Sequence, residues 1–155
     1  MSAGLVAQHV TRVFRGGAGV HGVDLEVRPG EIHALVGLNG AGKTTLMKLL
    51  LGMLRPTVGA VILDGVPLST LPASAWAGVG HVIEHPLAYG DLTARQNLLP
   101  AARLRKLSAN TAAVVVASAI DELGLALYAD VRARRLSAGN RQRVGLAAAL
   151  QHHPV

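Results

Sequence analysis

The spacing of apolar positions divides the chain into a β-rich first part and a helical second part. Short apolar and β-branched runs, broken by glycine and proline turns, predict three strands between Leu5 and Val36. The last of these strands covers residues 31–36, and further short strands are predicted at 59–63 and 79–83. We therefore expect a sheet in the first part of the chain.

Three segments carry helix signals. Residues 44–54 are apolar on nearly every side until Pro56 ends the run, which predicts a buried helix. Thr93 and Gln96 have the spacing of a capping box and predict the start of a second helix. A third helical run covers residues 111–123, so the chain becomes helical beyond about residue 91.

The amino-acid composition restricts the classes of protein and of site that this pattern can represent. A chain of 155 residues that is 50% hydrophobic can build one domain with a sizeable core. The absence of cysteine excludes disulfides, thiol catalysis and thiolate metal sites, and we expect a cytoplasmic protein without a membrane span of its own. The net charge of +6 comes largely from arginines without interleaved aromatics, which favours a solvated face over a nucleic-acid surface. The clustered arginines are Arg132, Arg134, Arg135, Arg141 and Arg143.

A glycine-rich loop lies between a predicted strand and a predicted helix. Its pattern is Gly37, four further residues, then Gly42-Lys43-Thr44, which in this context forms a phosphate cradle. The glycines let backbone N–H groups approach phosphates, and the helix N-terminus adds its positive dipole end. Lys43 reaches the β- and γ-phosphates as a point charge.

The two threonines complete the predicted site. The Thr44 hydroxyl is suited to bind Mg²⁺ between the β- and γ-phosphate oxygens, and Thr45 can bond the α-phosphate. The expected cofactors are ATP and Mg²⁺. The residues predicted to hold them here are Gly37, Asn39, Gly40, Gly42, Lys43, Thr44 and Thr45.

A second motif narrows the class of P-loop protein. The segment Leu136-Ser-Ala-Gly-Asn-Arg-Gln-Arg143 resembles the signature motif of ABC ATPases, with Ser137 and Gly139 at the phosphate-contacting positions. Ala138 and Asn140 depart from the usual motif. Ser137 can also cap the helix that follows, so that its hydroxyl and the helix dipole face one anion. The resemblance implies that this anion is the γ-phosphate on a second ATP-binding subunit, in a head-to-tail dimer.

Two more positions acquire roles through the resemblance. Phe14 falls where the family places an aromatic residue that stacks on adenine. Glu84 stands at the Q-loop position, where most members have glutamine, and an acidic residue there resembles the branch that exports bacitracin- and lantibiotic-type peptides. We expect Glu84 to approach Mg²⁺ and its waters and to transmit the nucleotide state, because a carboxylate is a better ligand for a hard cation than an amide.

The resemblance implies an α/β P-loop NTPase fold with an N-terminal antiparallel β subdomain and a helical subdomain, truncated before the Walker B strand. Residues 1–155 then form one incomplete ABC ATP-binding domain. Its parts are a β-rich core at about 1–90, a helical subdomain at about 91–135, and the signature motif with its helix at 136–155. The family's Walker B Asp, catalytic Glu and switch His are expected beyond Val155, so steady hydrolysis by this chain alone is not expected.

Other motif matches are weaker. The pattern of His81, Glu84 and His85 fits a zinc protease motif only on a helix, whereas the β-branched residues between them favour a strand. Asp64 follows an apolar run, as a Mg²⁺-binding Asp would, but Gly65 makes a β-turn the better interpretation. The pair at 152–153 is interpreted as part of a loop.

The leading functional prediction is an ATP-binding subunit that energises a membrane ABC transporter, an exporter of peptide antibiotics or similar cargo. The expected partners are a second ATP-binding subunit and a membrane-spanning permease, at the inner face of the cell membrane. One alternative is a soluble ABC ATPase acting on nucleic acid or translation, but the short interval from Lys43 to Ser137 favours transport. The other is a truncated, non-hydrolysing ATP-binding module.

Overall fold

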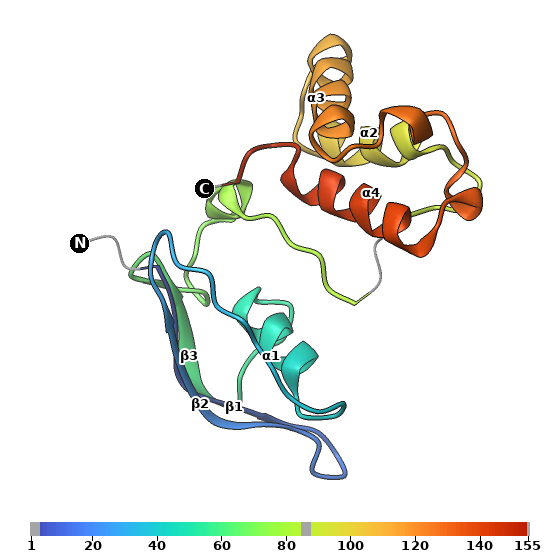
Figure 1. The fold of residues 1–155 in the computed structure, drawn as a ribbon. Helices are drawn as coiled ribbons and strands as arrows, with labels where there is room; N and C mark the ends of the chain where they lie inside the picture. The colour runs from blue at the N-terminus through green and yellow to red at the C-terminus, as the bar shows by residue number, and fades with distance from the viewer. Residues whose placement is uncertain (1–3, 85–87, 155) are drawn as a thin grey trace. The chain divides into compact units, whose positions relative to one another are not determined.

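The computed structural model describes residues 4–84 and 88–154. The chain divides into two compact units, Met1–Pro72 and Ala73–Val155. The first unit contains an antiparallel sheet and one helix, and the second contains three longer α-helices (Figure 1). The predicted fold class, an α/β chain with a β subdomain first and a helical subdomain after it, is confirmed.

The sheet of the first unit has four strands in the order β2-β1-β3-β4, all antiparallel to their neighbours. They are β1 (Leu5–Val13), β2 (Gly19–Val27), β3 (Val58–Leu63) and the short β4 (Val66–Pro67). The register of β1 shifts against both neighbours near His9, whose φ of 48° marks a β-bulge. Two of the three strands expected before residue 36 are therefore present.

The turn between β3 and β4 is the one that the sequence predicted. Asp64 and Gly65 both have positive φ, 48° and 80°, and they connect the paired residues Leu63 and Val66. Positive φ at both central residues defines a type I′ turn, for which Asp-Gly is a preferred sequence. Asp64 is accordingly a turn residue.

Helix α1 (Lys43–Leu50) packs on the sheet. Leu46 and Leu49 are buried together with residues of β1, β2 and β3, and this cluster is the core of the first unit. The prediction that the helix continues to Leu54 is wrong. The helix ends because Gly52 adopts a left-handed φ of 66°, with its N–H donating to the carbonyl of Leu49 at 3.0 Å.

The strands predicted at 31–36 and 79–83 are not formed, and both segments are irregular. Residues 28–41 are all exposed, including Ile32 at 98% and Val36 at 88%. A strand is stable only where a neighbour satisfies its N–H and C=O groups. Among residues 4–84 and 88–154 no strand pairs with either segment, so local β preference is not enough.

The second unit is built on α2 (Ala94–Leu104), α3 (Ala109–Glu122) and α4 (Ala138–Leu150). Helix α2 contacts both of the others, and small apolar side chains from all three form the core. The predicted capping box is present: Thr93 Oγ1 accepts from the N–H of Gln96 at 3.1 Å, and the Gln96 side chain accepts from the N–H of Thr93. Short 3₁₀ turns complete the unit at η1 (Ala73–Gly78), η2 (Ala126–Tyr128) and η3 (Ala133–Arg135).

Candidate functional site

The glycine-rich loop ends at the first turn of α1. Lys43 is the first helical residue, and Gly42 before it has a left-handed φ of 86°. A Cβ atom at Gly42 would lie 2.5 Å from the carbonyl oxygen of Gly19 and 2.8 Å from a methyl group of Val20. Both the backbone conformation and this close approach require glycine. The loop therefore lies directly against the start of β2.

The ammonium group of Lys43 lies inside its own loop. Its Nζ donates to the carbonyl oxygens of Gly37 at 2.6 Å and Leu38 at 2.7 Å. The loop is closed further by the N–H of Ala41, which donates to the same Leu38 oxygen at 3.2 Å. Because a phosphate oxygen is a stronger acceptor for an ammonium group than a neutral carbonyl, the same side chain is able to turn to an anion.

A cavity of about 360 Å³ lies beside the loop. It is lined by Phe14, Ala18, Gly19, Asn39, Gly40, Gly42, Lys43, Thr44 and Thr45. Phe14 reaches it from the hairpin between β1 and β2, where its N–H donates to the carbonyl of Ala18 at 2.8 Å. One cavity therefore joins an aromatic ring, a helix N-terminus, an ammonium group and two hydroxyls. Seven residues that the sequence singled out line it, and Gly37 contacts Lys43.

These residues fit a nucleoside triphosphate with Mg²⁺. Phe14 offers a partly exposed ring for a base, and the free N–H groups at the start of α1 can receive phosphate oxygens. In the part of the chain that the structure describes, no group of three His, Cys, Asp or Glu side chains could hold a metal ion. Of the residues that line the cavity, Thr44 and Thr45 carry hydroxyl oxygens that could bind a Mg²⁺ ion together with phosphate oxygens.

The signature segment lies in the second unit, at the start of α4. Ser137 is the N-cap of this helix, as predicted, and its Oγ accepts from the N–H of Asn140 at 3.1 Å. Ser137 and Gly139 are both exposed. A Cβ atom at Gly139 would meet nothing within 4 Å. The segment thus presents a hydroxyl and a helix N-terminus on an open surface, and none of its residues is among those that line the cavity.

Glu84 lies in an irregular segment of the second unit, exposed and with a left-handed φ of 62°. His81 belongs to the same segment, which is not helical. His85, the other histidine of the zinc-type pattern, lies outside the described residues. The roles predicted for Glu84 at Mg²⁺ and in coupling stay predictions.

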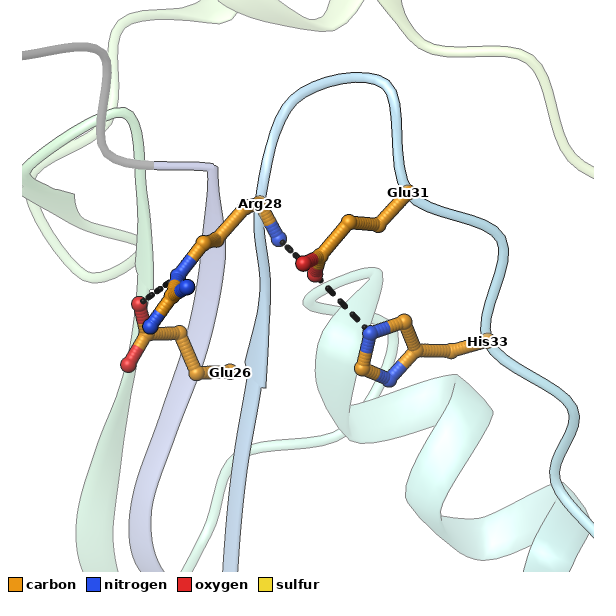
Figure 2. Close-up of polar contacts among 4 residues, drawn as sticks. All are labelled: Glu26, Arg28, Glu31 and His33. Carbon is orange, nitrogen blue, oxygen red and sulfur yellow. Dashed lines mark hydrogen bonds and ion pairs between the residues drawn. The ribbon is translucent and has the colours of Figure 1, made fainter.

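Charged side chains hold the turn that leads from β2 into the glycine-rich loop (Figure 2). A carboxylate oxygen of Glu31 accepts from the backbone N–H of Arg28 at 2.9 Å and bonds Nε2 of His33 at 3.0 Å. These hydrogen bonds lower the pKa of Glu31. Glu26 in turn bonds Nε of Arg28 at 3.0 Å and raises the pKa of that guanidinium. All four side chains are solvated, so they shape the turn more than they stabilise the fold.

Sequence reasoning missed Asn97, the best-connected polar side chain of the second unit. It is 8% exposed, and its Oδ1 accepts from the N–H of Tyr89 at 2.7 Å. Its Nδ2 donates to the carbonyl oxygens of Tyr89, Leu92 and Thr93 at 3.1, 3.3 and 2.9 Å. The available signal was its position on the otherwise apolar face of a predicted helix. Asn97 fixes the loop between the segment of Glu84 and α2.

Comparison with known proteins agrees with this geometry. The chain matches the family model of ABC transporters over residues 20–155, and it belongs to this family as an ATP-binding domain.

Among its relatives is the arabinose import ATP-binding protein AraG 1 of Burkholderia cenocepacia, 38% identical over 99% of this chain and 31% of the relative. The Nod factor export ATP-binding protein I of Burkholderia thailandensis is 38% identical over 87% of this chain and 44% of its own length. The fold is similar to that of cbiO1 from Clostridium perfringens, described as part of the ABC transporter complex cbiONQ. The TM-score is 0.83, the identity 24%, and the match covers 99% of this chain and 63% of cbiO1.

These relatives do not single out the bacitracin and lantibiotic branch. One is named for import and another for export, and the chain spans well under two thirds of either. Within residues 4–84 and 88–154, no helix is long and apolar enough to cross a membrane.

Proposed function

We propose that this chain binds ATP-Mg²⁺ in the cavity around Lys43 and is the nucleotide-binding part of a subunit that energises a membrane transporter. The observation that carries the proposal is the composition of one cavity: Phe14 lines it together with the N-terminus of α1, where Lys43, Thr44 and Thr45 lie. An aromatic ring next to a phosphate cradle is suited to a nucleotide rather than to a simple phosphate.

Each residue has a part in holding the nucleotide. The adenine stacks on Phe14, and the triphosphate lies over the glycine-rich loop, where Lys43 leaves its carbonyl partners for the β- and γ-phosphates. Thr44 contributes its hydroxyl to Mg²⁺, and Thr45 bonds the α-phosphate. Because Gly42 brings the loop against the start of β2, the base wall and the phosphate cradle keep a fixed separation.

The signature segment completes the site of a second subunit. Ser137 and Gly139 lie exposed at the N-terminus of α4, with open space around Gly139. A γ-phosphate on a second copy meets this end favourably, because the hydroxyl and the helix dipole both attract an anion. ATP then joins two subunits head to tail.

The remaining assignments concern the whole transporter. A membrane-spanning permease is the partner, and the chain acts at the inner face of the cell membrane. Peptide antibiotic export is the cargo class suggested by Glu84. Transport assays with candidate peptides on the complete subunit and its permease test this assignment, and transport of a sugar in the import direction would replace it.

Nucleotide binding is tested by calorimetric titration of the full chain with ATP and Mg²⁺. The variant Lys43→Gln should lose at least about tenfold in affinity, because a charge-assisted bond to phosphate is removed. The matched control is Lys48→Gln, in the same helix but outside the residues that line the cavity. Equal loss of affinity in both variants would contradict a site at Lys43.

Head-to-tail pairing is tested by sedimentation with and without ATP-Mg²⁺. The wild-type chain should form a dimer only with ATP, whereas Gly139→Asp should bind ATP normally and remain a monomer. An aspartate in the first turn of α4 favours that helix, yet it repels the phosphate of a partner. Normal dimerisation of Gly139→Asp rules out the signature segment as the second half of the site.

A further inference from the structure

Arg12 lies against the aromatic residue of the cavity. Its guanidinium carbon is 5.4 Å from the centroid of the Phe14 ring, within the range of a cation–π contact. The Arg12 side chain is partly buried, and its Nε is enclosed without a hydrogen-bond partner among the described residues. The contact with the ring is the interaction that the structure shows for this guanidinium within the described residues.

Phe14 needs such a support. It is 39% exposed and is the first residue of the loop between β1 and β2. The loop contains Gly16 and Gly17, both with positive φ and with open space around them. A ring at this place has freedom to rotate, and freezing it when a base binds costs conformational entropy.

The two side chains have different relations to the cavity. Phe14 is one of the residues that line it, and Arg12 is not. Arg12 therefore contacts the ring from outside the lining while leaving ring surface available to a ligand. Arg15 follows Phe14 directly, is exposed, and has no cation–π contact with it among the described residues.

We propose that Arg12 is a positioning residue for base recognition: its guanidinium holds the Phe14 ring in the orientation that stacks on the nucleotide base. This inference rests on the proposed role of Phe14 in binding adenine. A planar guanidinium suits the task better than an ammonium group, because it stacks on an aromatic face. The contact acts on the base, whereas the phosphates are held by Lys43 and the N-terminus of α1.

The test compares ATP with inorganic tripolyphosphate, both with Mg²⁺, by calorimetry on the full chain. Arg12→Leu keeps an apolar stem and should weaken ATP binding about two- to fivefold while leaving tripolyphosphate binding unchanged. The control Arg15→Leu removes the same charge from the same hairpin and should change neither affinity. Arg12→Lys should recover part of the ATP affinity.

Repeating the Arg12→Leu replacement in the Phe14→Leu variant distinguishes a failure of the Arg12 role from a failure of the Phe14 role on which it rests. In Phe14→Leu, adding Arg12→Leu should cause no further loss of ATP affinity, since the ring is gone. Equal weakening of both ligands by Arg12→Leu, or an undiminished effect in Phe14→Leu, overturns the positioning role. If Phe14→Leu alone leaves ATP affinity unchanged, the stacking role of Phe14 fails first. Unfolding curves for each variant verify that the sheet is intact.

Discussion

Single residues fix the geometry of this domain where backbone segments meet. Gly42 is the clearest case, because a left-handed φ and contact with Gly19 coincide at one position. Asn97 plays the corresponding part in the second unit, where one amide makes hydrogen bonds with four backbone groups of the loop before α2. Gly42 lines the cavity and also determines the path of its loop, whereas Asn97 determines the path of a loop without lining that cavity.

Replacing Gly42 by alanine should weaken nucleotide binding. The added methyl group conflicts with the Gly19 carbonyl, and the left-handed backbone becomes strained, so the loop must move. We expect ATP affinity to fall by at least about tenfold in calorimetry. Gly65→Ala is the control: its φ is also left-handed, at 80°, but open space surrounds it and it is remote from the cavity lining. It should lower stability and keep ATP affinity.

Replacing Asn97 by alanine should destabilise the second unit by about 1–3 kcal/mol, because a nearly buried amide is removed and the N–H of Tyr89 loses its hydrogen-bond partner. Urea unfolding followed by the fluorescence of Trp76, the only tryptophan, measures this unit. Asn110→Ala, on the exposed side of α3, should change stability by no more than about 0.5 kcal/mol. Similar losses for both variants would show that the loop is held by other contacts.

At the level of secondary-structure elements, the turns and helix caps that depend on residues close together in the chain could be predicted from the sequence. The Asp64-Gly65 turn and the caps at Thr93 and Ser137 depend on residues within a few positions of each other, and all are present. The strands expected at 31–36 and 79–83 failed because pairing is not local. A run of β-branched residues favours an extended backbone, but hydrogen bonds to a neighbouring strand decide whether a strand forms.

The segment 32–38 should therefore exchange its amide hydrogens rapidly. No backbone hydrogen bond is donated by residues 32–38 within the described chain, and Ile32 and Val36 are nearly fully exposed. Hydrogen–deuterium exchange with mass spectrometry should show nearly unprotected amides there and slow exchange in residues 5–7 of β1, which pair on both sides. Strong protection at 32–36 would reveal pairing in solution.

On the scale of the whole molecule, one histidine makes stability depend on pH. His152 is partly buried after α4, and both of its ring nitrogens are enclosed. Burial, together with the positive charge of Arg105, lowers the pKa of His152 below its usual 6.5. Between the lowered pKa and the usual one, His152 is mostly neutral in the folded chain and mostly protonated in the unfolded chain.

Stability of the second unit should accordingly fall as pH decreases. Above the ordinary pKa of 6.5 the imidazole is neutral in both states, and below it the unfolded state binds more protons until the folded pKa is passed. Urea unfolding between about pH 7 and about pH 5.5 measures the slope. His152→Phe should flatten it and His153→Asn should not. An unchanged slope in His152→Phe would assign the effect to other groups.

The candidate site, like the secondary structure, could be predicted in part from the sequence. The motif from Gly37 to Thr45 and the aromatic residue Phe14 could be found in the sequence, and the structure gathers most of them around one cavity. The contact between Gly42 and Gly19 could not, because it joins segments that are far apart in the chain. The contacts of Arg12 with Phe14 and of Asn97 with the loop before α2 are local, but they depend on side-chain orientation, which the motifs do not specify. Motifs identify the chemistry, whereas the supporting contacts depend on the fold.

The hairpin loop at the edge of the cavity offers a place for a spectroscopic reporter. Arg15 is exposed there, directly after a residue that lines the cavity, and the next two glycines have open space around them. The sequence contains no cysteine. A single Arg15→Cys replacement would consequently carry one thiol-reactive dye at the rim, without background labelling, and its emission would follow nucleotide entry in real time.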